Sequence, residues 1–369
     1  MAGASTQSAP MHVGLVIYGD LDATSGGFRY DRQLVSYLRE QGDTVDVISL
    51  PWRSYHRGVL DGIAPSIRSK LDRPVDVLVQ DGLCHPSLWR QNRHLSEPGS
   101  TVALVHHLQS DDPTGQFASL YRPFERRFLG SVDAAISTSA FIRTHASELA
   151  PSLAGKPSLV ARPGGRTDGR ALSPTQVTDR AKAEPLRIVY VGNVVPRKDP
   201  ETLVAAVARG RPERDWELTV VGSHESTPDY ADSVVRAAEQ RGVEDCVEFT
   251  GEVDTDALEG VLERSHVCCV PSRYEAFGMV YLEAMEYGVV PIASSVGGAS
   301  EFVEHEHNGF VVDPGHDAGI AAILTALDDD RERLARLGEG ALLTAEQHPT
   351  WDETMAEIRA FLQSLSDGQ

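Results

Sequence analysis

The chain has 369 residues, of which 41% are hydrophobic and 24% charged, a composition typical of a globular protein rather than a disordered or collagen-like one. At roughly 100–200 residues per domain, this length favours two domains. The formal net charge of −20 argues against a nucleic-acid-binding role, because such proteins usually present a basic face.

The acidic charge is concentrated in the second half of the chain. Residues 1–180 carry 19 basic and 18 acidic side chains, whereas residues 181–369 carry 15 basic and 36 acidic ones. The nearly neutral first half could approach an anionic partner or a membrane surface without the repulsion that the second half would meet. An arbitrary drift of surface charge explains the asymmetry about equally well.

Targeting and membrane signals are absent from the sequence pattern. Residues 1–10 are small and polar, lack the apolar stretch of a signal peptide, and predict a disordered N-terminus. No stretch approaches the ~18 continuous apolar residues of a membrane span. We therefore expect a cytoplasmic protein. A peripheral membrane contact through its N-terminal domain is compatible with the sequence. Its four cysteines, too few for a disulfide framework in a chain of this length, predict buried free thiols: Cys84, Cys246, Cys268 and Cys269.

Short β-rich apolar runs alternate with helical segments in the first half, which predicts a parallel sheet with crossover helices. The predicted strands are near-continuous in Val, Ile and Leu, as expected of strands buried on both faces: 12–18, 44–50, 75–80, 101–105, 133–137 and 158–161. A helix over 27–41 follows the first of them. After the last of these strands, a Pro- and Gly-containing stretch breaks the alternation and predicts an interdomain linker at residues 166–185.

The same alternation resumes in the second half. The predicted strands there are 187–194, 217–222, 246–249, 266–270, 290–293 and 309–312. Helices are predicted between them at about 200–209, 230–241, 256–264 and 279–287, and a final amphipathic helix over 351–365. The fold class is thus α/β, with doubly wound domains at 11–165 and 186–349 and a last segment, 350–369. Ligands of such folds bind at the carboxyl ends of the strands, so the functional residues are expected in the loops there.

The loop after the first strand ends in Gly26 and Gly27, directly before a helix. Two glycines let the backbone approach a ligand, and the helix N-terminus presents free N–H groups to an anion. The spacing is not the G-x-G-x-x-G of dinucleotide-binding proteins. Taken alone, the loop is explained more simply as a tight turn.

The richest segment is 271–285, PSRYEAFGMVYLEAM, which follows a buried strand and opens a helix near Gly278. Glu275 lies just before that helix and Glu283 inside it; eight fully helical steps between them would span about 12 Å. This separation is too large for two carboxylates that act on one bond. It suits two acceptors that bind different hydroxyl groups of an elongated ligand, with phosphates at the helix N-terminus between them. Two solvated glutamates on a surface helix are the alternative.

This segment resembles the family-4 retaining glycosyltransferases of the GT-B fold. The other segments that match the family are EYGVVP at 286–291, GGASE at 297–301, VEFTGEV at 247–253, GNVVPRK at 192–198 and the helix that begins at Trp351. The similarity is dense over about 187–314 and thinner in the first half, where Gly26-Gly27 and VHHL at 105–108 carry it. The resemblance implies two Rossmann-like domains that face a deep cleft, with the last helix crossing back to pack on the first domain.

The resemblance further implies a nucleotide-diphosphate-sugar donor, bound mainly by residues 186–349, and no cofactor or metal. Glu283 would hold the ribose hydroxyls, Glu275 the hydroxyls of the donor sugar, and Val253 would lie beside the base. Four residues would turn backbone N–H groups toward the sugar and phosphates: Phe277, Gly278, Met279 and Val280.

A cation for the departing diphosphate is expected after the first strand of the second domain. By the resemblance, Lys198 would neutralise this group; a fixed cation stabilises developing negative charge without a metal. The family usually places an arginine immediately after the glycine, where this chain has Asn193. Neighbouring Arg197 is the candidate replacement, and a plain surface charge is the alternative for it.

His106 and His107 end the fourth strand of the first domain. Side chains alternate between the two faces of a strand, so one of the two is expected to enter the cleft. Alignment with the family's Val-His-x-Leu selects His106, which would contact the donor sugar near the reacting carbon, and leaves His107 as a packed, hydrogen-bonded histidine. Gly26 and Gly27 would approach the diphosphate or the acceptor.

Together these residues predict a retaining, metal-independent glycosyltransferase of the hexosyltransferase type, active in polysaccharide or glycoconjugate synthesis. The acceptor hydroxyl would attack on the face from which the diphosphate leaves, and a phosphate oxygen would take its proton. The acceptor is open: a sugar, a lipid-linked sugar or another hydroxyl compound. Two alternatives remain, a sugar-nucleotide epimerase, which needs further acid/base groups, and a catalytically silent sugar-nucleotide-binding subunit, which the Asn193 departure keeps open.

Overall fold

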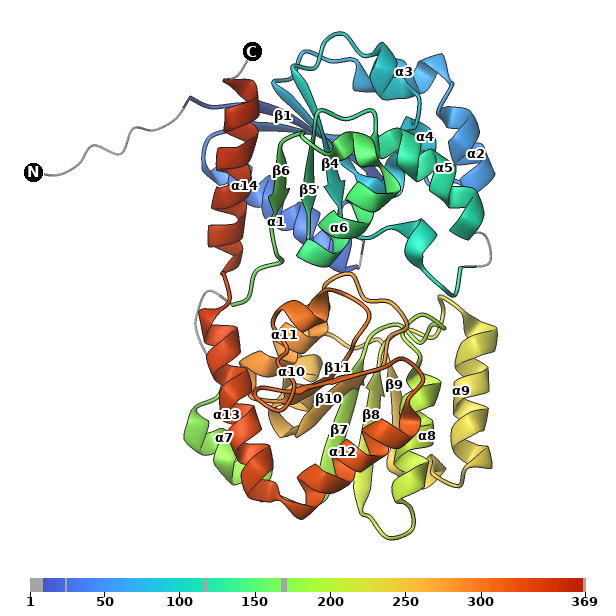
Figure 1. Ribbon diagram of the computed structural model, residues 1–369, viewed down its shortest axis with the longest axis vertical. Helices are drawn as coiled ribbons and strands as arrows, with labels where there is room; N and C mark the ends of the chain where they lie inside the picture. The colour runs from blue at the N-terminus through green and yellow to red at the C-terminus, as the bar shows by residue number, and fades with distance from the viewer. Residues whose placement is uncertain (1–8, 24, 116–117, 167–170, 368–369) are drawn as a thin grey trace, which may run out of the picture. The chain divides into compact units, whose positions relative to one another are not determined.

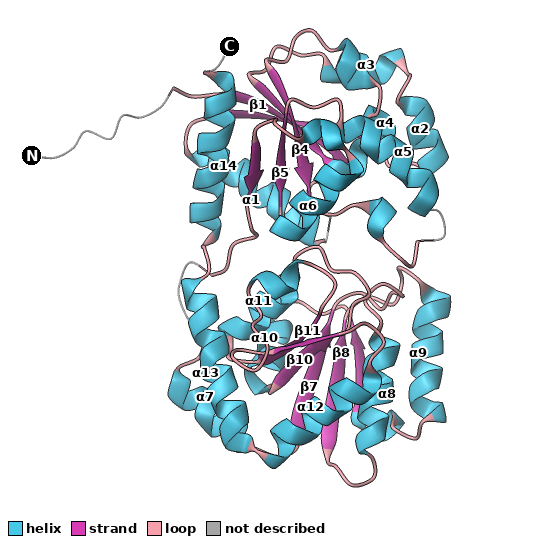
Figure 2. Ribbon diagram, viewed as in Figure 1, coloured by secondary structure: helices cyan, strands magenta, loops and turns pink. Residues whose placement is uncertain are grey.

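The computed structural model describes residues 9–23, 25–115, 118–166 and 171–367. The chain divides into two compact units, and we call them the first and second unit. The first comprises Met1–Asp111, Gly115–Pro163 and Trp351–Gln369, and the second Asp112–Thr114 and Gly164–Thr350. Each holds a six-stranded sheet with helices (Figures 1 and 2). The segment expected to be a disordered N-terminus lies, for residues 1–8, outside the described residues.

The sheet of the first unit is parallel throughout and has the strand order β2-β1-β3-β4-β5-β6. Its strands are β1 (His12–Tyr18), β2 (Thr44–Leu50), β3 (Val77–Asp81), β4 (Ser100–Val105), β5 (Ala134–Ser137) and β6 (Ser158–Val160). Its α-helices are α1 (Gly26–Glu40), α2 (Tyr55–Asp61), α3 (Pro65–Leu71), α4 (His85–Leu88), α5 (Ala118–Leu129), α6 (Ala140–Leu149) and α14 (Trp351–Ser366). The predicted strands of this half are thus all present, with ends shifted by at most a few residues.

The C-terminal helix α14 belongs to the first unit, which confirms the predicted contact between the last helix and the first domain. Its buried side chains follow the predicted helical spacing: Trp351, Thr354, Met355, Ile358 and Leu362. The ring of Trp351 packs edge-on against Tyr30 of α1 at 5.6 Å between centroids. Arg359 grips the buried carboxylate of Asp43 through two hydrogen bonds of 2.7 and 3.1 Å. Apolar burial and the paired hydrogen bonds between Arg359 and Asp43 therefore both hold this helix against the rest of the first unit.

The sheet of the second unit is also parallel, with the order β12-β11-β10-β7-β8-β9. Its strands are β7 (Leu186–Val191), β8 (Trp216–Val221), β9 (Val247–Gly251), β10 (Val267–Val270), β11 (Val290–Ser294) and β12 (Phe310–Val312). Its α-helices are α7 (Pro174–Ala181), α8 (Pro200–Gly210), α9 (Pro228–Gln240), α10 (Thr255–Arg264), α11 (Met279–Glu286), α12 (Asp317–Asp329) and α13 (Arg331–Gln347). Residues from both faces of this sheet join one hydrophobic core.

The segment 166–185, predicted as a linker, contains helix α7 and belongs to the second unit. Ser173 and Gln176 form a capping box at its start, and Val177 and Ala181 are buried. With only two apolar positions in eight residues, the helix leaves little periodic signal in the sequence. Residues 167–170 of this segment lie outside the described part of the chain.

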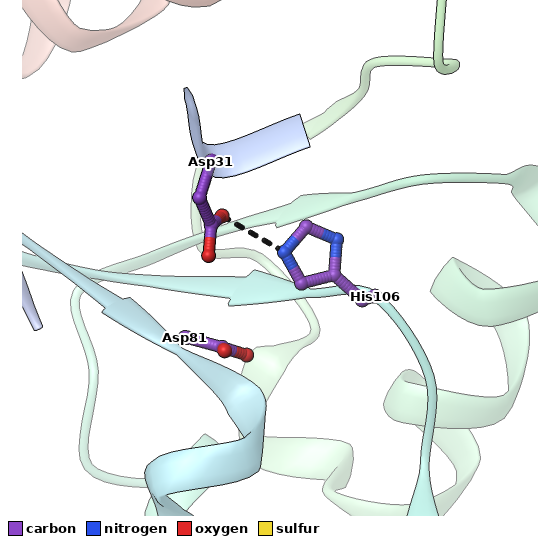
Figure 3. A group of neighbouring side chains, drawn as sticks. All are labelled: Asp31, Asp81 and His106. Carbon is purple, nitrogen blue, oxygen red and sulfur yellow. Dashed lines mark hydrogen bonds and ion pairs between the residues drawn. The ribbon is translucent and has the colours of Figure 1, made fainter. Parts of the chain in front are cut away.

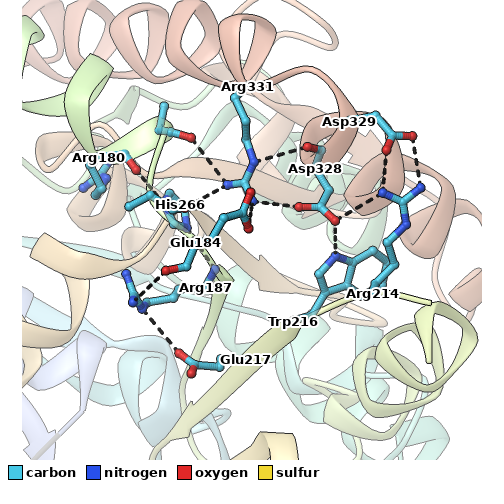
Figure 4. A network of polar contacts seen from close by, with 12 residues as sticks. Arg180, Glu184, Arg187, Arg214, Trp216, Glu217, His266, Asp328, Asp329 and Arg331 are labelled. Atoms are coloured by element: carbon cyan, nitrogen blue, oxygen red, sulfur yellow. Dashed lines mark hydrogen bonds and ion pairs between the residues drawn. The ribbon is translucent and has the colours of Figure 1, made fainter. Parts of the chain in front are cut away.

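A polar network closes the amino ends of the strands in the second unit (Figure 4). His266, before β10, accepts a hydrogen bond from the Arg187 backbone at 2.9 Å and donates one to the Arg180 carbonyl at 2.8 Å. Burial lowers the pKa of His266 to about 4, so it serves here as a neutral ring. On β8, the Trp216 indole donates to Asp328 at 3.0 Å. These contacts hold the amino ends of the strands in place. A functional site is therefore expected at the opposite edge of the sheet, in the loops at the carboxyl ends.

The four cysteines are all buried and free, as predicted. Among the described helices, none combines the length and the apolar character that a bilayer crossing requires.

Candidate functional site

Three loops of the second unit follow neighbouring strands and carry the predicted motif residues. They come after β7, β10 and β11, which are adjacent in the sheet. Because the strands are parallel, their carboxyl ends share one edge, and the loops meet there. The residues below lie in or beside these loops.

Lys198 folds back over Gly192 at the end of β7. A Cβ on Gly192 would lie 2.7 Å from Cδ and 2.8 Å from Nζ of the lysine, and the φ of this glycine is +145°. Any larger residue would therefore strain the backbone and displace the lysine. Gly192 in the predicted GNVVPRK segment thus makes room for the ammonium group.

Two cations from the loop after β7 lie close to Glu275. Its Oε2 lies 3.6 Å from Lys198 Nζ and 3.9 Å from Arg197 Nη1, and it accepts a hydrogen bond from Ser272 Oγ at 3.1 Å. Burial alone would raise the pKa of Glu275, but Lys198, then Arg197 and the Ser272 hydroxyl, outweigh it and hold the pKa below its usual range. The structure therefore presents an ionised carboxylate with two adjacent cations.

The predicted GGASE segment fixes the backbone of Glu275. The Glu275 N–H donates to the Val296 carbonyl at 3.1 Å, and the Glu275 carbonyl accepts from Gly298 N–H at 3.0 Å. Gly297, with φ of +145°, passes so close that a Cβ there would lie 1.9 Å from the Glu275 carbonyl oxygen. Only glycine fits this approach, which ties the carboxylate to the loop after β11.

Helix α11 begins directly behind Glu275, at the predicted position. Gly278 is its N-cap, with φ of +92°, and no side chain caps the helix. The first N–H groups of a helix have no partner within it, so those of Met279 and Val280 are donors suited to an anion. Glu283 lies in the second turn and is partly buried. Carboxylate, N–H groups and a second carboxylate thus follow one another along this loop and helix.

Asn193 and Arg197 occupy different surroundings in the loop after β7. Asn193 is exposed, and its amide donates to Ser226 Oγ at 3.4 Å. Arg197 donates to the Tyr274 carbonyl at 2.9 Å and so reaches the loop that holds Glu275. The guanidinium that neighbours Glu275 therefore comes from position 197 and not from position 193.

Three residues of this cluster were not identified from the sequence: Ser272, Asp199 and Arg273. Arg273 pairs with the buried Asp199 at 3.0 Å, and its N–H donates to the Arg197 carbonyl at 2.8 Å. These bonds clamp the loops after β7 and β10 together. Their one signal in the sequence is position: Asp199 follows Lys198, and Ser272 and Arg273 lie three and two residues before Glu275. Val253, predicted to lie beside the base, is partly buried after β9, at the edge of the sheet, and packs on the core.

In the first unit, His106 belongs to a buried polar cluster with Asp31 and Asp81 (Figure 3). Its Nε2 hydrogen-bonds Asp31 Oδ1 at 3.0 Å, and its side chain is 8% exposed. Gly27 lies against the ring: a Cβ there would sit 3.4 Å from His106 Cδ2. The predicted Gly26-Gly27 loop and His106 are therefore brought together, with Asp31 one turn along α1.

The ionisable groups of this cluster shift the pKa values of Asp81 and His106. Burial and the charge of Asp31 raise the pKa of Asp81 to about 7. Burial opposes the charged form of His106, but the carboxylate of Asp31, its hydrogen bond and Asp81 outweigh this effect and raise the pKa of the ring. Asp31 Oδ2 is fully buried and, among the described residues, has no partner. His106 is thus held toward its imidazolium form.

The same three side chains are the group in the described part of the chain whose donor atoms could hold a metal ion. One ligand atom from each lies within 4.8 Å of the others. Two carboxylates and an imidazole are a donor set that divalent metals accept. In the structure a hydrogen bond joins Asp31 to His106, and independence from metal stays a prediction.

The two histidines differ from expectation in one respect. His106 is the more buried of the pair and His107 is only partly buried, whereas we expected His107 to be the packed one. Strand β4 ends at Val105, so the alternation between faces on which the expectation rested no longer applies. The Thr138 hydroxyl fixes this turn by donating to the His106 carbonyl at 3.1 Å.

Comparison with known proteins gives this geometry a context. Residues 176–343 match the protein family described as glycosyl transferases group 1. The chain is 29% identical to the D-inositol 3-phosphate glycosyltransferase of Corynebacterium glutamicum over 73% of its own length and 66% of that protein. It is 33% identical to the GDP-mannose-dependent alpha-(1-6)-phosphatidylinositol monomannoside mannosyltransferase of Mycobacterium tuberculosis, over 47% of its length and 46% of that protein. The chain thus spans between about half and two thirds of these relatives.

Solved structures extend the likeness to nearly the whole chain. Sucrose-phosphate synthase from Thermosynechococcus elongatus superposes with a TM-score of 0.82 at 20% identity and covers 98% of this chain and 100% of that one. Anabaena Alr3699/HepE in complex with UDP and glucose gives a TM-score of 0.73 at 19% identity, covering 96% and 100%. At these identities the likeness shows the fold, which is GT-B as the sequence predicts.

Proposed function

The chain belongs, through residues 176–343, to the group 1 glycosyl transferases, and from this premise we propose that it moves a sugar from a nucleotide-diphosphate-sugar to an acceptor hydroxyl. The transfer is of the hexosyltransferase type and retains the configuration of the reacting carbon. The second unit binds the donor, and the first unit binds the acceptor.

The observation that carries this proposal is the meeting of Lys198, Arg197 and Glu275 at one edge of the second sheet. A sugar diphosphate offers hydroxyl groups, which an ionised carboxylate can accept, next to phosphates, which cations neutralise. The uncapped start of α11 adds N–H donors on the same side.

Each side chain then has a role in the reaction. Glu275 holds the sugar hydroxyls, Glu283 holds the ribose, and Lys198 with Arg197 stabilises the charge that grows on the departing diphosphate. The acceptor hydroxyl attacks from the face that the diphosphate leaves, and a phosphate oxygen takes the proton. His106, held toward the imidazolium form by Asp31, donates a hydrogen bond to the donor sugar.

For the acceptor, the names of the relatives support a phosphorylated polyol or a lipid-linked sugar. One relative is named for D-inositol 3-phosphate and another for a phosphatidylinositol monomannoside. Both acceptors carry hydroxyl groups beside a phosphate. A soluble sugar remains the alternative acceptor in the test below.

The test begins with donor binding. Thermal unfolding of the protein with UDP-, GDP- and ADP-sugars should reveal one base whose sugars raise the melting temperature, because a ligand of the native state stabilises it. That donor is then incubated with inositol phosphate, a lipid-linked sugar and free sugars, and the released nucleoside diphosphate is measured.

Three outcomes separate the candidate functions. Acceptor-dependent release with an α-linked product from an α-linked donor supports the proposal. Epimerisation of the donor without an acceptor would identify the enzyme as a sugar-nucleotide epimerase. Donor binding without turnover across the acceptor panel would identify a silent sugar-nucleotide-binding subunit, the alternative that Asn193 keeps open.

A further inference from the structure

The first unit carries an uneven share of exposed apolar side chains. Among the described residues, six large hydrophobic side chains are exposed, and four of them fall in two short stretches of this unit: Trp52 at 65%, Leu60 at 64%, Leu120 at 59% and Ile63 at 51%. Trp52 precedes α2, Leu60 lies on it, Ile63 follows it, and Leu120 lies in the first turn of α5. Single exposed hydrophobic residues are ordinary, but a cluster of four marks an interaction surface.

Helices α2 and α5 lie beside each other, so the two stretches form one surface (Figure 1). The ring of Tyr55 on α2 packs against that of Tyr121 on α5 at 4.1 Å between centroids, with the ring planes tilted by 41°. Gly58 marks the inner side of α2, since a Cβ there would lie 3.1 Å from Pro86. Leu60 and Arg57 are on the opposite, exposed side.

Basic residues are frequent in the same two stretches. Residues 52–71 and 118–129 contain seven basic residues: Arg53, Arg57, Arg68, Lys70, Arg122, Arg126 and Arg127. Their two acidic residues, Asp61 and Glu125, are both buried, and Asp61 neutralises Arg53 across 3.1 Å. In a chain of net charge −20, a face with cations and no exposed carboxylate within these stretches stands out.

We propose that this basic-apolar surface, formed by residues 52–71 and 118–129, binds the face of an anionic lipid bilayer. Arginine and lysine meet the lipid headgroups, while the tryptophan and the aliphatic side chains enter the interface between headgroups and acyl chains. Helix α2, with seven residues, is too short to span a bilayer, so the contact is peripheral.

The mixture of residues favours a bilayer over other partners. A soluble polyanion would need the cations but not four protruding hydrophobic side chains. A protein partner with an apolar groove would need the hydrophobic side chains but not the cations. A lipid surface uses both, and the two contributions add. The proposal stands apart from the proposed glycosyl transfer, because it can be tested without turnover.

The experiment is cosedimentation of the full chain with vesicles of phosphatidylcholine alone and of phosphatidylcholine mixed with phosphatidylglycerol. Binding is expected to the mixed vesicles and to weaken as salt is added. Arg57→Gln, Arg122→Gln and Arg126→Gln should each lower the partition coefficient about fivefold, since a cation near an anionic surface contributes about that factor. Leu60→Ser with Ile63→Ser should lower it at unchanged charge.

Matched controls come from the second unit. Leu343 is 46% exposed on α13, and Arg236 is exposed on α9. Leu343→Ser and Arg236→Gln should bind vesicles as the unchanged protein does. Melting temperatures show that every variant is folded. The proposal is overturned if the unchanged protein ignores the mixed vesicles, or if the control variants lose as much binding as the surface variants. It is also overturned if free polyphosphate or a second copy of the chain occupies the surface while vesicles do not.

Discussion

Asp31 and His106 are 75 residues apart in the sequence and share a buried hydrogen bond of 3.0 Å. With Nε2 committed to this carboxylate, Nδ1 is the ring nitrogen left to hydrogen-bond a ligand. A charged partner of this kind both orients an imidazole and favours its protonated form. Asp31 is therefore a positioning residue for His106.

Replacing Asp31 should move the pH dependence of the reaction. The folded-state pKa of His106 is raised, so the imidazolium is present at low pH and is lost as the pH rises through that pKa. If the imidazolium is the active form, the loss of kcat with rising pH should begin at lower pH in Asp31→Asn. The pH profile of kcat measures this shift, and His106→Gln should remove that limb. An unchanged profile in Asp31→Asn would contradict the role given to the pair.

Variants of Lys198 and Glu275 should differ in their affinities for the free nucleoside diphosphate and for the intact donor. Lys198→Ala should lower kcat about 10²–10³-fold, the range for removal of one charge-stabilising group. It should also weaken binding of the free nucleoside diphosphate. Glu275→Gln should keep or strengthen that binding, because the variant frees Lys198 and Arg197 from a competing carboxylate. It should weaken binding of the intact donor, whose sugar it no longer holds.

Calorimetric titration of both variants with the nucleoside diphosphate and with the donor gives the comparison. Arg209→Ala, a cation of the same unit that pairs with Asp317, is the control and should change neither affinity. If Glu275→Gln lost the nucleoside diphosphate as severely as Lys198→Ala, Glu275 would belong to the nucleotide end of the site.

Turnover should survive removal of divalent metal. The cations beside Glu275 are supplied by side chains, and they can stabilise a departing diphosphate directly. We expect equal rates before and after dialysis against EDTA. Should activity vanish and return with Mn²⁺ or Mg²⁺, the cluster of Asp31, Asp81 and His106 would become the candidate metal site, and Asp81→Asn should then raise the metal concentration needed for half-maximal activity.

The apolar face of α14 should be essential to the stability of the first unit. Ile358 is fully buried, and Ile358→Ala should lower the free energy of unfolding by about 2–5 kcal/mol, the range for such truncations. Leu365→Ala, at a partly exposed position of the same helix, should cost much less. Truncation before Trp351 should lower the melting temperature further. Equal denaturation midpoints for the two point variants would show that α14 adds no packing energy.

Much of the fold could be predicted because its strands are buried on both faces. Runs such as 101–105 and 267–270 are apolar throughout, bounded by polar turns, and match β4 and β10 closely. Helix α7 could not be predicted in this way, since its stability rests on a capping box and on two buried side chains. Periodicity alone does not register such a helix.

The two halves of the candidate site were unequally predictable. In the second unit, Glu275 stands in a short segment whose spacing already suggests a phosphate and hydroxyl site, and the family resemblance adds Lys198 and Arg197. In the first unit, Asp31 and Asp81 join His106 only because β3 lies between β1 and β4, which brings the start of α1 and the end of β3 to one place. Strand order is a property of the whole sheet, and no local pattern contains it.

The return of α14 to the first unit also sets an order for folding during synthesis. The second unit is nearly contiguous, so it can close as soon as residue 350 has left the ribosome. Until α14 follows, Tyr30 on α1 lacks the Trp351 ring that packs on it. At ~5–20 residues per second, making the second unit takes roughly 10–40 s, during which the first unit waits incomplete. Chaperone binding to nascent chains should therefore concentrate on the half that is made first and finished last.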